Sequence, residues 1–229
     1  MSNIDGFKFE NKDLDFPFYK KNPHIPKWGW IVLFIATFVG LILSVSSNIL
    51  ISVLSCLVLI VPVLYFLKWD YKAIFQIPKA KDVALAVALF VGYIAYSLII
   101  SIVLENFGIV SEGIIDSTTV SVMSLIPLVF SLMSEEFVKF IPFMFLLRLS
   151  YKFSDNRKLS VIISVILIMI FFASLHAYNF KMFIFAIFVQ GFGSIFEFIG
   201  YIKTKNIFVS YITHLCTDIF IYSIVILGL

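Results

Sequence analysis

The stretch MSEEFVKFIPF, from Met133 to Phe143, carries two adjacent glutamates and a lysine among residues that otherwise suit a lipid bilayer. An acid or lysine near the centre of a membrane helix costs about 2.5–3.5 kcal/mol on insertion scales, so such groups point to function. The ionisable groups in apolar segments of the chain are Glu135, Glu136, Lys139, His176, Glu197, His214 and Asp218. Glutamate, histidine and aspartate side chains are the groups with which hydrolytic enzymes activate water.

Helical spacing determines which of these side chains can meet. Residues four apart share one face of a helix, so Glu135 can reach Lys139. Glu136 lies three residues before the lysine and can compete for it. The glutamate that is left without the lysine can then serve as a general base.

The two histidines are placed by the same rule. Phe172 and His176 are four residues apart, as are His214 and Asp218, so each pair can face one neighbour. One histidine can orient a water molecule, and the other, with an acid, can donate hydrogen bonds to the oxyanion that forms when water attacks an amide carbonyl. The set of Glu135, His176, His214 and Asp218 also offers the ligand types that hold zinc, so a divalent metal is the alternative to a site without a cofactor.

Each group also has a structural interpretation. An intramembrane glutamate and lysine can neutralise each other and join two helices. Glu197, in GFGSIFEFIG, lies close to a basic connection and can reach toward water or Lys203. A transporter or a non-catalytic immunity protein could use the same cluster as a proton or ion relay.

The elements that must position these residues are membrane helices. Of 229 residues, 61% are hydrophobic and 14% are charged, with a mean hydropathy of +1.05. Because a spanning helix needs roughly 20 mostly apolar residues, the sequence predicts an all-α, polytopic transmembrane helical bundle with about seven spans, or eight. The predicted runs are Trp28–Ser46, Ile49–Leu67, Asp82–Leu104, Thr119–Leu147, Leu159–Tyr178, Met182–Tyr201 and Ile207–Leu227.

The basic residues alternate between successive connections. Loops on the cytoplasmic side collect lysine and arginine, which predicts a multi-pass protein of the cell membrane with a cytoplasmic N-terminus. The residues assigned to the cytoplasmic side are Lys8, Lys12, Lys20, Lys21, Lys27, Lys68, Lys72, Lys79, Lys81, Arg148, Lys152, Arg157, Lys158, Lys203 and Lys205. On the other side only Lys181 is expected. The net charge of +3 reflects this topology, so the lipid bilayer is the expected partner and nucleic acid is not.

Three short motifs in order resemble the CPBP family of intramembrane proteases, which includes the CAAX prenyl endopeptidases and the bacterial Abi proteins. They are SEEFVKF with Glu135 and Glu136, FASLH from Phe172 to His176, and HLCTD from His214 to Asp218. The resemblance covers about Thr119 to Asp218. Together with the hydropathy pattern, it predicts a cytoplasmic tail (1–27), N-terminal membrane helices (28–118) and a catalytic membrane region (119–229).

The resemblance implies a role for each matched residue. Glu135 would activate water, with His176 positioning it and Glu136 supporting the site. His214 and Asp218 would bind the oxyanion, although many family members have Asn in place of the aspartate. An aspartate can donate to an oxyanion only as a neutral acid. Lys139 and Phe172 would be supporting residues.

The first motif departs from the EExxxR pattern common in the family, because position 140 is Phe140 and the basic residue is Lys139. EExxK is similar to the PrsW proteases, which cleave anti-sigma factors, but those have FxxxE where this chain has FxxxH. The CPBP resemblance is therefore favoured, and PrsW-like specificity stays open. The implied activity is hydrolysis of a peptide bond in a membrane-associated protein or peptide, as in CAAX-type processing, pheromone maturation or bacteriocin immunity.

Overall fold

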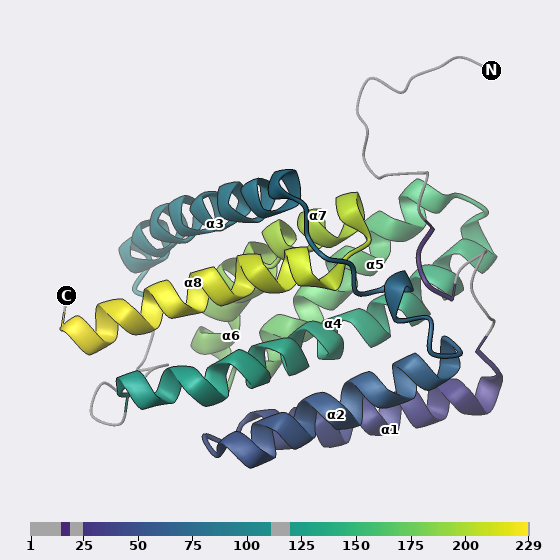
Figure 1. Cartoon of the computed structure of the whole chain (residues 1–229). Coiled ribbons are helices and arrows are strands. Elements are labelled where there is room, and N and C mark those ends of the chain that lie inside the picture. Colours follow the sequence, from purple (N-terminus) through teal and green to yellow (C-terminus); the bar gives the residue numbers. More distant parts are fainter. Residues whose placement is uncertain (1–14, 19–24, 111–119, 229) are drawn as a thin grey trace.

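The computed structural model describes residues 15–18, 25–110 and 120–228, and the regular elements in these ranges are all helical. The predicted all-α bundle is therefore confirmed (Figure 1). The predictions for the charged residues of the first 14 positions, and for Lys20 and Lys21, lie outside the described residues.

The helices follow the predicted runs closely. They are α1 (Lys27–Ser44), α2 (Ile49–Phe66), α3 (Ala80–Asn106), α4 (Leu125–Ser154), α5 (Arg157–Leu175), α6 (Phe180–Ala186), α7 (Ile195–Thr204) and α8 (Ile207–Leu227), with short 3-10 turns at Tyr71–Ala73 and Val122–Ser124. A π-helical turn, η3 (Ile187–Gly191), joins α6 to α7.

Within the described residues, six stretches are long and apolar enough to cross a membrane, namely α1, α2, α3, α5, Phe180–Thr204 and α8. The remaining predicted run is α4, which has 30 residues but carries the two glutamates and Lys139. Its predicted start at Thr119 lies outside the described residues, and the helix begins at Leu125. The chain is thus a multi-pass helical bundle whose most polar long helix is the one with the EE motif.

That polar helix lies at the centre of the bundle. It packs against α1 and α2 on one side and against α5 and α8 on the other, while α3 lies along α8 and α7 (Figure 1). Because α4 is covered by protein rather than lipid, nearly every residue from Ser134 to Met144 is buried. This is the environment in which membrane helices tolerate ionisable groups.

The sixth predicted run is broken at η3, and glycines allow the broken part to approach its neighbours. A Cβ on Gly191 would lie 2.8 Å from the Met169 carbonyl oxygen on α5, and one on Gly193 would lie 2.4 Å from the Tyr93 ring on α3. Small residues at such crossings are the usual means by which membrane helices pack closely. The segment around η3 therefore packs closely against α5 and α3.

Hydrogen bonds tie the basic connections together at one end of the bundle. Asn206, between α7 and α8, accepts from the Gln76 backbone N–H at 3.2 Å and donates to the Gln76 carbonyl at 2.8 Å. Asp15 of the tail pairs with Arg157, the first residue of α5, at 2.6 Å. The connections predicted to share one side of the membrane thus share one end of the fold.

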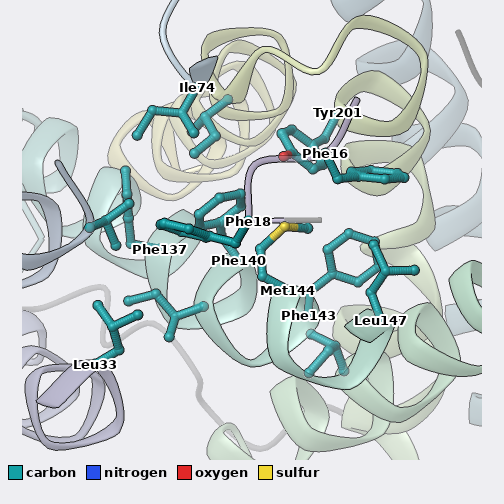
Figure 2. Packing of buried hydrophobic residues seen from close by; sticks show 14 of the residues in the cluster. Phe16, Phe18, Leu33, Ile74, Phe137, Phe140, Phe143, Met144, Leu147 and Tyr201 are labelled. Carbon is teal, nitrogen blue, oxygen red and sulfur yellow. The ribbon is translucent and has the colours of Figure 1, made fainter. Parts of the chain in front are cut away.

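Beneath this basic end lies a group of stacked aromatic side chains, which we call the aromatic layer: Phe16, Phe140, Phe143 and Tyr201. The Phe16 ring lies 5.8 Å from Phe143 and 6.0 Å from Tyr201, measured between ring centroids, and Figure 2 shows them with their neighbours. All four are buried. The Lys205 ammonium lies 3.6 Å from the Phe16 ring centroid. The tail is therefore anchored in the bundle through Phe16.

The buried position of Phe16 predicts a large effect of truncation. Phe16→Ala removes a fully buried ring, and such changes cost about 3–5 kcal/mol, so we expect a clear decrease in the melting temperature of the purified protein in detergent. Phe153→Ala is the matched control, because Phe153 is 80% exposed near the same end. Equal melting temperatures for the two variants would contradict the anchoring of the tail.

Candidate active site

A group of ionisable side chains is buried where α4, α7 and α8 meet, and we call it the charge cluster: Glu136, Lys139, Glu197 and His214. The Lys139 ammonium lies 2.6 Å from Glu136 Oε1 and also contacts Glu197 Oε2. These side chains are 4–8% exposed. A buried lysine that bridges two carboxylates compensates the cost of removing all three charges from water.

Glu136 is held from three directions. Besides contacting Lys139, Glu136 accepts two hydrogen bonds. His214 Nδ1 donates to its Oε1 at 2.8 Å, and the Ser210 hydroxyl donates to its Oε2. An ionised carboxylate only accepts hydrogen bonds, so the proton of this pair lies on Nδ1 of the imidazole. Glu136 therefore fixes the orientation of His214 and directs its other nitrogen, Nε2, away from the cluster.

His214 Nε2 faces two further carboxylates. Glu135 Oε2 and Asp218 Oδ1 each lie 3.9 Å from it. Their side chains are 24% and 27% exposed, against 4% for Glu136. The imidazole thus separates a buried carboxylate that orients it from two accessible ones.

The accessible carboxylates line a cavity of about 800 Å³. This volume falls in the range of roughly 300–1,000 Å³ typical of ligand sites. Its residues come from the α1–α2 connection, α3, α4, α5, the broken helix and α8. Those with polar side chains are Ser44, Ser46, Ser47, Tyr93, Ser97, Ser101, Ser124, Ser131, Glu135, His176, Gln190, Glu197, His214, Asp218 and Tyr222. A peptide segment and water can therefore reach the carboxylates.

His176 lies on the wall of the same cavity, at the end of α5. Its Nδ1 is 2.9 Å from the Phe172 carbonyl oxygen, an acceptor, so Nδ1 carries the proton and Nε2 is left as an acceptor. Phe172 is buried, with its ring centroid 4.6 Å from that of His176 and 6.3 Å from that of His214. The Lys139 ammonium is 4.7 Å from the same ring. Phe172 thus fills the space between the two histidines.

The structure brings together most of the residues that the sequence singled out. Glu135, Glu136, His214 and Asp218 form one group with Lys139, and His176 joins it across the cavity. Of the two predicted pairings of the lysine, the one with Glu136 is observed. Glu135 is therefore the glutamate of the pair that does not partner this lysine.

Glu197 differs from its expected position. It is 4% exposed and contacts Lys139 rather than Lys203. Because α7 packs against α3 and α8, the side chain of Glu197 points into the bundle. The sequence carried a signal for it, because Gly193 and Gly200 lie four residues before and three after Glu197 and mark the closely packed face of the helix. Gln190, on η3, is a further cavity residue that the spacing rules did not find.

The most closely spaced donor set fits a metal poorly. Within the described ranges, the acidic and histidine side chains whose ligand atoms all lie within 4.8 Å of one another are Glu136, Glu197 and His214. The Lys139 ammonium already contacts both of these glutamates, so a divalent ion would have to displace a bound cation. The predicted zinc set of Glu135, His176, His214 and Asp218 stays a prediction: Glu135 and Asp218 each lie 3.9 Å from His214 Nε2, and His176 lies on the wall of the same cavity.

The charge cluster predicts a specific pattern of stability. Lys139→Met leaves two buried carboxylates without their cation, and breaking such a pair costs about 3–5 kcal/mol. We expect a lower melting temperature in detergent, whereas Lys181→Met, at an exposed lysine, should change it little. Adding Glu197→Gln to Lys139→Met removes one uncompensated charge and should recover part of the loss. A double variant no more stable than Lys139→Met would argue against the bridge.

Comparison with known proteins identifies one related family. Residues 117–220 match the family model described as type II CAAX prenyl endopeptidase Rce1-like. No curated protein and no solved structure matches the chain. The matched segment includes α4, α5, the broken helix and the half of α8 that carries His214 and Asp218. Residues 117–220 are thus similar to the CAAX-type membrane proteases of this family.

Proposed function

We propose that this protein is an intramembrane endopeptidase that hydrolyses a peptide bond of a membrane-associated protein or peptide with water activated by Glu135. One observation carries the proposal: Lys139 is engaged by Glu136 and Glu197, so that Glu135 faces the cavity beside His214 Nε2. A carboxylate that is accessible to water and is not paired with the lysine is suited to accept a proton.

In the proposed reaction, a water oxygen attacks the carbonyl carbon while Glu135 takes the proton of that water. Proton transfer of this kind contributes about 10²–10⁴-fold to the rate. His176 Nε2, an acceptor on the cavity wall, orients the same water. The proton then passes from Glu135 to the leaving amine nitrogen as the C–N bond breaks, so the carboxylate is regenerated.

The oxyanion is assigned to His214 and Asp218. In the protonated imidazole, Nδ1–H donates to Glu136 and Nε2–H is directed into the cavity beside Glu135. In the proposed reaction, negative charge develops there on the substrate oxygen. Asp218 donates a second hydrogen bond only as a neutral acid. Glu136 is a positioning residue in this scheme, because it acts through His214 rather than on the substrate.

The mechanism that we propose uses no metal ion. The closest group of carboxylate and imidazole ligands is already bridged by Lys139. That lysine supplies a positive charge which is fixed by two carboxylates and stays in place through the reaction. Zinc held by the accessible residues remains the competing proposal, and chelation separates the two.

The first test compares protein N-termini in cells that express the chain or its Glu135→Gln variant at matched levels. Termini that depend on the chain should fall by about 10²–10⁴-fold in rate of appearance with the variant, and their sequences identify the substrate. Glu105→Gln is the control, because Glu105 is an exposed glutamate at the end of α3 that does not line the cavity. Unchanged termini in Glu135→Gln would overturn the assigned role and favour the relay or immunity function.

The second test uses chelators on the purified protein and a substrate from the first test. Because Lys139 takes the cation position, 1,10-phenanthroline and EDTA should leave the rate of cleavage unchanged. A loss of cleavage that added zinc restores would establish a metallo-endopeptidase instead. The inactive Glu135→Gln protein provides the background rate.

A further inference from the structure

The catalytic cavity opens at one end of the bundle, and that end is opposite to the basic connections. Its outermost residues are Ser44–Ser47 between α1 and α2, Val120 and Ser124 before α4, and Val225 near the end of α8. In chain order, these positions alternate with the connections that carry lysine and arginine. In Figure 1 the C-terminal end of α8 lies far from the corner between α4 and α5.

The basic end of the bundle is closed beneath the same site. Along α4 and α7, the aromatic layer lies between the charge cluster and the basic connections. Phe16 is 0% exposed within this layer, and Figure 2 shows it among Phe140, Phe143 and Tyr201. Phe140 and Phe143 follow Glu136 and Lys139 on α4 toward this end. Arg148 also donates to the Phe18 carbonyl oxygen at 3.2 Å, which fixes the tail over the closed end. Water and substrate therefore have their way in at the opposite end.

The charges of the described connections orient the bundle. The basic end carries residues from four segments, among them Lys68, Lys72, Lys152 and Lys203, whereas Lys181 is the basic residue of the described part at the cavity end. Because lysine and arginine collect on the cytoplasmic side, the basic end is cytoplasmic and the mouth of the cavity is not.

We infer that this protease acts on the extracytoplasmic side of the membrane. This inference rests on the proposed function and specifies its substrates as exported peptides or the extracytoplasmic juxtamembrane segments of membrane proteins. Serine hydroxyls at Ser47, Ser101 and Ser131 line the path to Glu135. These uncharged groups can hydrogen-bond a peptide backbone. The tail of a cytoplasmic protein would instead meet the aromatic layer.

Cysteine labelling tests the side of the cavity without requiring cleavage. In a chain whose own thiols are removed by Cys56→Ala and Cys216→Ala, Ser47→Cys places one thiol at the cavity mouth and Ser131→Cys places one a turn before Glu135. Lys152→Cys marks the opposite end, where the side chain is exposed. A membrane-impermeant maleimide is added to intact cells and to permeabilised cells, and labelling after denaturation gives the total thiol.

We expect both cavity thiols to react in intact cells as completely as after permeabilisation, and the Lys152→Cys thiol to react only after permeabilisation. The inverse pattern would place the cavity on the cytoplasmic side and overturn the inference. Cavity thiols that react under neither condition would contradict an open cavity, and Ser47→Cys alone decides the side if Ser131→Cys does not accumulate. Since labelling is independent of Glu135, a cytoplasmic cavity and an inactive protein are distinguishable outcomes.

Discussion

The bridge from Lys139 to Glu136 and Glu197 is the interaction on which the rest of the site depends. It joins α4 to α7 in surroundings where a single unpaired charge is strongly destabilising. The same bridge leaves Glu136 able to accept from His214 on α8, so three helices are held by one connected group. The positions of the side chains in the charge cluster therefore depend on charge neutralisation as well as on packing.

The neighbouring glutamates divide two tasks that one residue could not perform. Adjacent side chains on a helix diverge by about 100°, so Glu136 can point into the bundle while Glu135 points into the cavity. The buried one is saturated by a lysine, an imidazole and a hydroxyl. The accessible one lies 3.9 Å from His214 Nε2 and lines the cavity. Adjacency is what places the proposed positioning carboxylate and the proposed base at the same depth.

Much of this arrangement could be predicted from the sequence, because the cost of ionisable groups in lipid marks them plainly. The seven helical runs followed from hydropathy, and the pairing of His214 with Asp218 on one face followed from four-residue spacing. Spacing within α4 could not decide between Glu135 and Glu136 as the partner of Lys139. That choice depends on α7, which supplies Glu197 as a second carboxylate on the buried side. Nor does hydropathy reveal that η3 interrupts the sixth run.

The position of Phe16 shows that the described part of the tail belongs to the packed bundle although it precedes the first membrane helix. Its ring packs on Phe143 and Tyr201, which belong to α4 and α7, the two helices that the lysine bridge joins deeper in the bundle. Asp15 and Lys205 add an ion pair and a cation–π contact around it. The two helices are thus clamped at two levels, by charge at the cavity floor and by aromatic packing at the basic end. A bundle closed in this way can keep a water-filled cavity open at the other end without admitting water through its length.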